Sequence, residues 1–391
     1  MPFLFKGEGS ADCFCNWKFL TEKNMSFDVV EMWKELHAMP ELGFHEYKTS
    51  AYAAQKMREI GYEVTEGFGN TTAVVAYKRT GVPGPTLMVR CDMDALPFKN
   101  EDGSITAVHA CGHDSHVAMQ LATAAKVFED VKKGTLKFLF QPAEETLDGA
   151  VSVIKAGVLD DVDMAFGMHI RPEQDLVPGN FCASVNYTSS TFIKIAVKGV
   201  SCHASRPHLG ANAAEAAALI TNAICAMKLN PLLGWSCKVT QIEAAAAAIN
   251  VVPDSATLWL DARAQTNALM DELIAKVRVA AEFAAKAVGA TAEVILPHSP
   301  IPAPCYSPEL IAEAEEEIVR LFGKERLSAP CGGGGEDFNY FAKEKPSLKN
   351  AYFGIGVGAT PGLHNRAMHF DPKYLAGGVE LMSAMILRKL G

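Results

Sequence analysis

The stretch "HACGHDSH", from His109 to His116, places three histidines, a cysteine and an aspartate within eight residues. Two adjacent glutamates, Glu144 and Glu145 in "QPAEET", follow after one expected helix and one expected strand. Imidazole, carboxylate and thiolate groups together suit Zn²⁺, Mn²⁺ or Co²⁺. The alternative is a set of buried groups without a function. Burial of such groups unpaired is costly, so a metal centre is the better interpretation.

Further ionisable side chains follow the apolar runs that we expect to be strands. They are Asp92 and Asp94 after "TLMVR", Glu144 and Glu145 after "LKFLF", His169 after "MAFGM" and His364 after "AYFGIGVG". Chemistry in open α/β sheets lies at the carboxyl ends of the strands, so these side chains are expected to converge. More than four ligands suggests two ions, which can share a water, lower its pKa toward about 7 and polarise a carbonyl oxygen.

The adjacent glutamates can divide two tasks between them. Glu144 and Glu145 lie outside any expected helix, so their side chains cannot share one direction. One can bind a metal ion while the other faces the water, as a general base beside a ligand requires. A cysteine between two cations is held as thiolate. Isolated histidines such as His37, His45 and His298 are instead expected to be solvated or hydrogen-bonded.

The expected elements predict two domains, because a single core rarely grows beyond about 250 to 300 residues and the chain has 391. Alternating strands and helices indicate an α/β layer fold. Over residues 186–297 the expected order becomes βαββαβ, a compact sandwich. We therefore expect a larger α/β domain, residues 25–185 and 298–391, interrupted by a smaller inserted one. Residues 1–24 are expected to be an extension, with Met25 as an alternative start.

The composition argues against several classes of function. A formal net charge of −9, a pI near 5.7 and the lack of a Lys or Arg run disfavour a nucleic-acid partner. No window reaches the roughly 18 to 20 apolar residues of a membrane helix, and the first residues make a poor signal peptide. Ten scattered cysteines are too dilute for a disulfide scaffold, so a reducing cytoplasm is expected. Cys13 and Cys15 are expected to be inert thiols rather than metal ligands.

Eight motifs occur in an order that resembles one family. They are "RCDMDALPF", "HACGHDSHVA", "QPAEET", "GMHI", "GVSCHASRPHLGANA", "INVVPD", "GGEDFNYF" and "LHNRAMHFDP". They resemble the motifs of the metal-dependent amidohydrolase and aminoacylase family, of the hippurate hydrolase, auxin-conjugate hydrolase and N-acetyl-diaminopimelate deacetylase type. The resemblance runs from about Phe27 to Gly391. It implies a zinc-peptidase-like catalytic domain with two divalent ions (Zn, Mn or Co) and an inserted ferredoxin-like domain that closes over the substrate and mediates dimerisation.

The resemblance also implies roles for individual residues. The metal ligands would be Cys111, His113, Glu145, His169 and His364, with His369 as the alternative to His364. Glu144 would be the general base, and Asp92 would orient a ligand imidazole. His203, from the inserted domain, would stabilise the oxyanion in an active site that could be the partner subunit's. Asn250 and Arg263 would bind the substrate, although an ion pair within the small domain explains Arg263 equally well.

The expected reaction is hydrolysis of the amide bond between an acyl group and an amino acid, by a homodimer acting on a small molecule. A dipeptidase or carboxypeptidase needs the same centre and stays open. A non-catalytic metal-binding or peptide-binding protein would have lost the base or several ligands, all of which are present. Thr146 stands where many relatives have glycine, which is expected to reshape the substrate pocket. The glycines Gly332 to Gly335 are expected to line that pocket.

Overall fold

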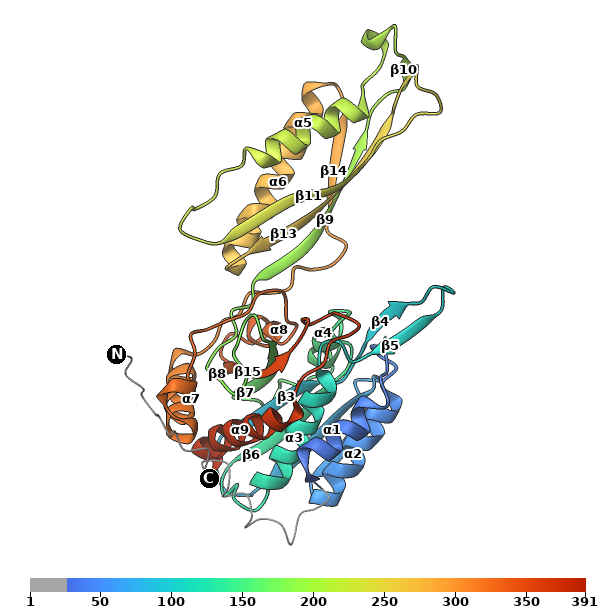
Figure 1. Cartoon of the computed structure of the whole chain (residues 1–391). Helices are drawn as coiled ribbons and strands as arrows, with labels where there is room; N and C mark the ends of the chain where they lie inside the picture. The colour runs from blue at the N-terminus through green and yellow to red at the C-terminus, as the bar shows by residue number, and fades with distance from the viewer. Residues whose placement is uncertain (1–26) are drawn as a thin grey trace, which may run out of the picture.

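The computed structural model describes residues 27–391, so the expected extension, the start at Met25 and the hypothesis on Cys13 and Cys15 lie outside the described residues. The described chain forms two units connected by two segments (Figure 1). The larger unit contains a seven-stranded sheet and the smaller one a four-stranded sheet. The expected mixed α/β class is confirmed. Among residues 27–391, no helix combines the length and apolar character that crossing a bilayer requires.

The large sheet is parallel at its centre. In spatial order its strands are β1 (Glu63–Phe68), β2 (Ala73–Arg79), β6 (Thr135–Gln141), β3 (Thr86–Asp92), β7 (Met164–Pro172), β15 (Lys349–Ala359) and β8 (Phe181–Cys182). Strands β6, β3, β7 and β15 run parallel, whereas β1, β2 and β8 run antiparallel to their neighbours. The parallel strands bring their carboxyl ends to one edge, where residues that follow them can meet.

Helices cover both faces of this sheet. One face carries α1 (Val29–His37), α2 (Tyr47–Ile60), α3 (His113–Val127), α7 (Pro308–Phe322) and α9 (Leu375–Leu390), and the other carries α4 (Gly149–Lys155) and α8 (Asn339–Glu344). The 3₁₀ turn Lys324–Arg326 follows α7, and the 3₁₀ turn Pro372–Tyr374 precedes α9. Strand β4 (Leu96–Lys99) pairs with β5 (Ile105–Val108) as a projecting hairpin.

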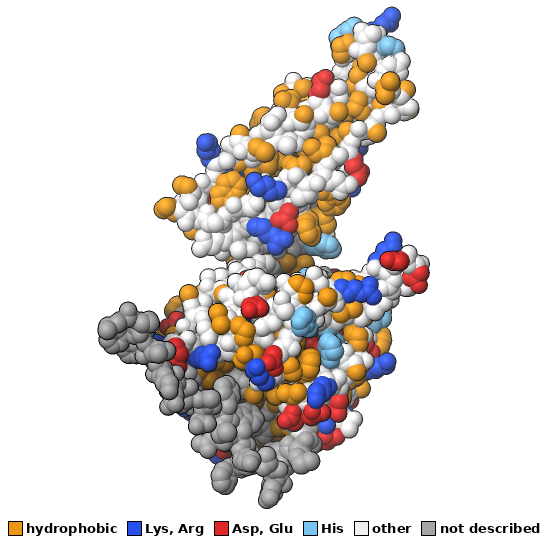
Figure 2. Space-filling view, in the orientation of Figure 1, with side chains coloured by type: hydrophobic (Ala, Val, Ile, Leu, Met, Phe, Trp, Pro, Cys, Tyr) orange, Lys and Arg blue, Asp and Glu red, His pale blue; other side chains and the backbone are white. Residues whose placement is uncertain are grey.

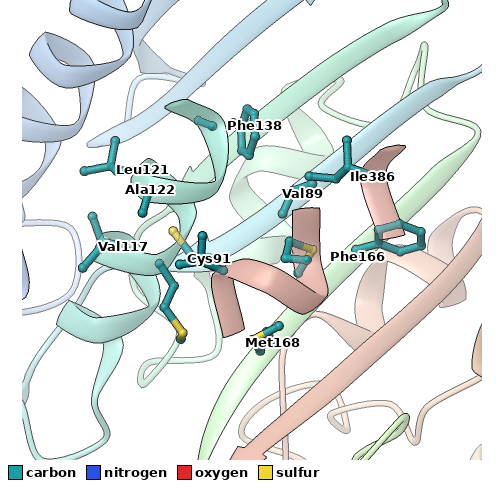
Figure 3. Close-up of a cluster of buried hydrophobic side chains, with 14 of the residues drawn as sticks. Val89, Cys91, Val117, Leu121, Ala122, Phe138, Phe166, Met168 and Ile386 are labelled. Carbon is teal, nitrogen blue, oxygen red and sulfur yellow. The ribbon is translucent and has the colours of Figure 1, made fainter. Parts of the chain in front are cut away.

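The core on the first face fixes α3 against the sheet. Figure 3 shows Val117 and Leu121 of α3 in the same buried cluster as Val89 and Cys91 of β3. Successive side chains of a strand point to opposite faces, so Met88 packs in the other cluster. Each large apolar side chain buried in this way contributes about 1.5 to 3 kcal/mol. The packing of α3 therefore determines the position of its first residue, His113.

The smaller unit has a core of its own. Its elements follow the order β9 (Ser189–Lys198), α5 (Ala213–Cys225), β11 (Trp235–Glu243), β13 (Ser255–Ala264), α6 (Asn267–Ala287) and β14 (Thr291–Ile295), with the sheet order β11-β13-β9-β14. Ile193, Ile220, Leu258 and Leu273 belong to one buried cluster of this unit. At its far end, β10 (Cys202–His203) pairs with β12 (Val251–Val252), near the 3₁₀ turn Pro207–Leu209. The boundaries 186–297 and a role as a lid stay predictions.

The two connecting segments contact each other where the units meet. The backbone of Ser190 and that of Ile301 exchange two hydrogen bonds, of 3.2 and 2.9 Å. The backbone N–H of Thr188 donates to the carbonyl of Gly334 at 2.9 Å, which ties the glycine-rich loop to the first segment. The glycine-rich loop is therefore in direct contact with the connection between the units.

Candidate functional site

The expected ionisable side chains lie at the carboxyl edge of the large sheet. Asp92 ends β3, the two glutamates follow β6, His169 lies in β7 and α3 begins at His113. His113 and His169 are buried, whereas 56% of the His364 side chain is exposed. The cluster thus lies between the core and solvent, as a site that receives a substrate must.

The five expected ligands are close to one another. The Sγ of Cys111 lies 3.5 Å from Nε2 of His169. The Oε1 of Glu145 lies 3.9 Å from Nε2 of His113 and 3.4 Å from Nε2 of His364. The ligand atoms of Cys111, His113 and His169 lie within 4.8 Å of one another, and so do those of Cys111, Glu145 and His364. Two triplets that share one thiol have the arrangement that two neighbouring cations require.

Two of these donor atoms are buried without a hydrogen-bond partner. They are Nε2 of His113 and Oε1 of Glu145. Nearly all buried polar atoms are hydrogen-bonded in proteins, so atoms without a partner need an explanation. A cation between them would satisfy both, and imidazole, thiolate and carboxylate are the donors that Zn²⁺ and similar ions accept. The residues present therefore fit a pair of divalent cations.

The turn after β6 holds the two glutamates apart. Ala143 has a φ of 55°, a conformation that non-glycine residues rarely adopt, and its N–H donates to Oε1 of the buried Glu46 at 2.8 Å. The N–H groups of Glu144 and Glu145 donate to the Asp94 carboxylate at 3.1 and 3.0 Å. The Oε2 of Glu144 lies 3.9 Å from Nε2 of His113. Glu144 is thus placed beside the ligands while Glu145 faces His364.

The two aspartates that follow β3 support different histidines. The Oδ1 of Asp94 lies 3.2 Å from Nδ1 of His113. Asp92, which was expected to orient a ligand imidazole, contacts Nδ1 of His116 at 2.6 Å and lies 3.8 Å from Nε2 of His113. The backbone N–H of Ile170 donates to Nε2 of His116 at 3.1 Å, so His116 ties Asp92 to β7. Asp94 thus supports the His113 ring, and Asp92 supports the His116 ring.

A buried ion cluster beneath the site was not anticipated from the sequence. The Arg90 guanidinium, which is completely buried, lies 2.9 Å from Asp92, 3.1 Å from Glu336 and 2.6 Å from Asp337. The Tyr352 hydroxyl donates to Glu336 at 2.7 Å. Adjacent acids in "GGEDF" were the only sign of this cluster in the sequence. The cluster contacts Asp92 through Arg90, and its acids Glu336 and Asp337 lie within 4.8 Å of Glu144, measured between carboxylate oxygens.

Burial dominates the acid–base properties of the site. It raises the pKa of the Glu144 carboxyl well above its usual range, and the negative charges of Glu336 and Glu145 raise it further. Burial likewise raises the pKa of the Cys111 thiol. For His113, burial opposes the charged form, but Asp92 and Cys111 outweigh it and raise the pKa. Cations must displace the protons that these groups retain, so metal binding is expected to weaken in acid.

The expected residues of the inserted unit are not brought to this site within the chain. Strand β10, which carries His203, lies at the end of the smaller unit farthest from the large sheet (Figure 1). The carbonyl of Asn250 accepts from the N–H of Ala204 at 2.9 Å, so both predicted residues share this end. Figure 2 shows histidine side chains exposed there. Arg263 forms a bidentate ion pair with Asp261, in which both hydrogen bonds are 2.9 Å long. An ion pair within the small domain was one of the two interpretations of Arg263 that the sequence left open.

Comparison with known proteins places the chain in a family. The sequence pattern of peptidase family M20/M25/M40 matches residues 88–388. The chain belongs to peptidase family M20/M25/M40. The expected resemblance to metal-dependent amidohydrolases and aminoacylases is confirmed, since relatives within this family carry such names.

Two relatives in sequence and one solved structure show which proteins the chain is similar to. Thermostable carboxypeptidase 2 of Saccharolobus solfataricus is 32% identical, over 84% of the chain and 86% of its own length. Indole-3-acetyl-aspartic acid hydrolase of Enterobacter agglomerans is 29% identical, over 92% of the chain and 95% of its own length. A dinuclear metal binding peptidase of the M20 family from Bacillus subtilis, of known structure, is 26% identical with a TM-score of 0.79, over 93% of the chain and 97% of its own.

Proposed function

We propose that this M20/M25/M40 protein is a metal-dependent amidohydrolase that cleaves the amide bond of N-acyl amino acids and carries two divalent metal ions, Zn, Mn or Co. One observation carries the proposal: two ligand triplets share Cys111, and the carboxylate of Glu144 lies beside them without completing either. The hydrolase of indole-3-acetyl-aspartate among the relatives acts on an N-acyl amino acid, which supports this substrate class. The dinuclear M20 peptidase supports the two ions.

The residues that would hold the ions are Cys111, His113, Glu145, His169 and His364. When bound, the cations lower the pKa of a water molecule and polarise the carbonyl oxygen of the substrate amide. Asp94 holds the His113 ring by its Nδ1 at 3.2 Å, which directs Nε2 toward the cluster. Orientation by an outer carboxylate fixes the ligand before an ion arrives.

Glu144 would act as the general base. It would take a proton from the water as its oxygen attacks the carbonyl carbon, and would return that proton to the nitrogen of the departing amino acid. The products are a carboxylic acid and a free amino acid. The Glu144 carboxyl is buried, and the backbone N–H of Glu144 donates to Asp94, which positions the turn that carries the base.

The inserted unit would supply the remaining contacts as a ferredoxin-like lid over residues 186–297. His203 would donate to the developing oxyanion, and Asn250 would bind the substrate carboxylate. Arg263, which pairs with Ser190 at the other end of the small sheet, would contact the substrate by leaving its Asp261 partner. Because β10 lies far from the large sheet of the same chain, the site that receives His203 and Asn250 would belong to a second copy in a homodimer. Exposed apolar side chains at this end, Leu209 and Ile249, support such a contact.

A second candidate is a carboxypeptidase or dipeptidase that uses the same centre. The observation in its favour is the 32% identical relative named thermostable carboxypeptidase 2. Dipeptides and N-acyl amino acids both carry an amino acid on the amine side of the scissile bond. They differ on the acyl side, where the dipeptide bears a second amino-acid residue. A non-catalytic binding protein is disfavoured, because Glu144 and the five ligands all lie at one edge of the sheet. A cytoplasmic location completes the proposal, supported by the free thiols of the described chain.

The test is a substrate screen on the purified protein loaded separately with Zn²⁺, Mn²⁺ and Co²⁺. We expect hydrolysis of indole-3-acetyl-aspartate, hippurate or N-acetyl amino acids, with at least about tenfold higher kcat/KM than for dipeptides. A higher kcat/KM for dipeptides than for N-acyl amino acids would favour the second candidate function, a carboxypeptidase or dipeptidase. No turnover with any of the three metals, in a protein that binds two ions, would leave the binding protein as the better account.

A further inference from the structure

Two thiols outside the proposed centre lie in contact. The Sγ atoms of Cys182, in β8, and Cys331, in the loop that leads to the four glycines, are 3.4 Å apart. The backbone fixes this approach, because the N–H of Asn186 donates to the carbonyl of Cys331 at 2.8 Å and Val185 pairs with Cys331 as a parallel bridge. The proposed reaction uses neither residue.

The two thiols have different surroundings. Cys182 is completely buried, whereas Cys331 is partly exposed. A hydrogen bond from Cys182 lowers the pKa of the Cys331 thiol, and the Arg171 guanidinium lowers it further. The same hydrogen bond and burial raise the pKa of Cys182. Cys331 is therefore the thiol that ionises and that a small oxidant can reach, and Cys182 is placed to react in a second step.

The Arg171 side chain is an independent sign of an anion at this position. Its Nη2 lies 2.5 Å from Asp175, but its Nε is buried without a hydrogen-bond partner. A buried guanidinium N–H without a partner is unusual, since arginine normally satisfies its donors. A thiolate at Cys331 would provide negative charge beside this group. The positive charge stabilises the reactive form of the thiol.

A disulfide at this position would move the glycine-rich loop. An S–S bond is about 2.05 Å long, so the two sulfur atoms must approach by more than about 1 Å. Five residues after Cys331 comes Glu336, and next to it Asp337, both of which contact Arg90 and thereby Asp92. The loop also accepts a hydrogen bond from Thr188 in the connection to the smaller unit. The cross-link thus acts on the support of the site and on the link between the units.

We propose that peroxides oxidise Cys182 and Cys331 to a reversible disulfide between the two residues. We propose further that this bond lowers turnover by restraining the loop that carries Glu336 and Asp337. The Cys331 thiol loses its proton, and the thiolate attacks one peroxide oxygen, which breaks the O–O bond and gives a sulfenic acid and hydroxide. The hydroxide takes up the released proton and becomes water. The Cys182 thiol then attacks that sulfur, forms the S–S bond and releases a second water. In sum, two thiols and one hydrogen peroxide yield one disulfide and two waters. The effect on turnover rests on the proposed amidohydrolase function, but the cross-link does not.

The experiment treats the metal-loaded full chain with hydrogen peroxide and maps the cysteines by mass spectrometry after digestion without reductant. We expect one peptide pair that joins Cys182 to Cys331, about 2 Da lighter than the two thiols together. The pair should be absent in Cys331→Ser and in Cys182→Ala, and present in the control Cys305→Ser, whose cysteine is exposed. Absence of the joined peptides in the wild type, while other thiols are oxidised, would overturn the proposal whatever the protein hydrolyses.

The second measurement is turnover before oxidation, after oxidation and after dithiothreitol. We expect kcat of the wild type to fall by about threefold to tenfold and to recover on reduction, because loop motions often limit turnover. Oxidation of the ligand Cys111 could also reduce activity, and Cys331→Ser distinguishes the two causes since it retains Cys111. Equal loss in Cys331→Ser and the wild type, or a complete cross-link with unchanged kcat, would overturn the regulatory part of the proposal.

Discussion

The Oδ1 of Asp94 lies 3.2 Å from Nδ1 of His113, and both side chains are completely buried. The same carboxylate accepts the backbone N–H groups of Glu144 and Glu145. One side chain thus sets the orientation of a proposed ligand imidazole and the position of the turn that carries the proposed base. Ligand and base are held relative to each other by a shared partner rather than by direct contact.

Replacement of Asp94 is expected to damage metal binding more than a change in any exposed acid. Asp94→Ala removes the acceptor of two backbone N–H groups, a buried one in Glu144 and a partly buried one in Glu145, and an unsatisfied buried group costs about 1 to 3 kcal/mol of unfolding free energy. Loss of the support for His113 should weaken metal affinity by about 10- to 100-fold. Asp94→Asn retains one oxygen acceptor and should fall between this variant and the wild type. Titration with a metal indicator measures the affinity, and Asp102→Asn in the β4–β5 turn is the control.

Replacement of Glu144 by glutamine should separate catalysis from metal binding. The amide cannot accept the proton of the attacking water, so kcat should fall by about 10²- to 10⁴-fold. Two ions per chain should remain, because Glu144 is not part of the triplets that share Cys111. Glu145→Gln is the matched variant and should lose an ion instead. Metal analysis beside initial rates measures both, and Glu144→Gln with preserved activity but lost metal would reverse the assigned roles.

The two histidines near the C-terminal end of the large unit should behave differently. His364 has a φ of 63° and directs Nε2 to within 3.4 Å of Glu145. The Nδ1 of His369 lies 3.1 Å from the carbonyl of Ala367 instead. His364→Ala should therefore bind fewer than two ions at metal concentrations that saturate the wild type. His369→Ala should bind two, and the reverse outcome would transfer the ligand role to His369.

Much of the site could be predicted because its parts have local signatures. The motif "CGHD" and the adjacent glutamates place several ligand types within a few residues, and parallel strands bring the residues at their carboxyl ends to one edge of the sheet. Helix α2 ends at Gly61, whose φ of 115° favours glycine, so such an end has a signature in the sequence.

Pairing between distant residues could not be predicted in the same way. Arg90 contacts Asp337, 247 residues later in the chain, and the choice of that partner depends on how β3 packs beside the loop before α8. The role of His116 had no separate signal, because its imidazole is one of three in the same motif. The separation of His203 from the large sheet depends on the length and direction of β9 and β13, which alternating apolar residues do not specify.

The pair formed by His37 and Asp114 should make stability depend on pH near neutrality. The Nδ1 of His37 lies 2.6 Å from Asp114, and this hydrogen bond raises the pKa of the histidine above its usual value of about 6.5. A raised pKa means that the folded state binds the proton more tightly than the unfolded chain. The contribution is therefore fully present below about pH 6.5 and is lost as the pH rises through the folded-state value.

The variant His37→Ala tests this dependence. About half of the His37 side chain, 49%, is exposed, so solvent screening should limit the loss to about 1 kcal/mol or less. Urea unfolding should show a larger difference between the wild type and His37→Ala at pH 6 than at pH 9. His45→Ala is the control, since the His45 ring contacts the carbonyl of Gly43 at 3.0 Å rather than a carboxylate. A difference that is constant from pH 6 to pH 9 would mean that His37 stabilises α1 by packing against Trp33, 5.2 Å away between ring centroids, and not by its charge.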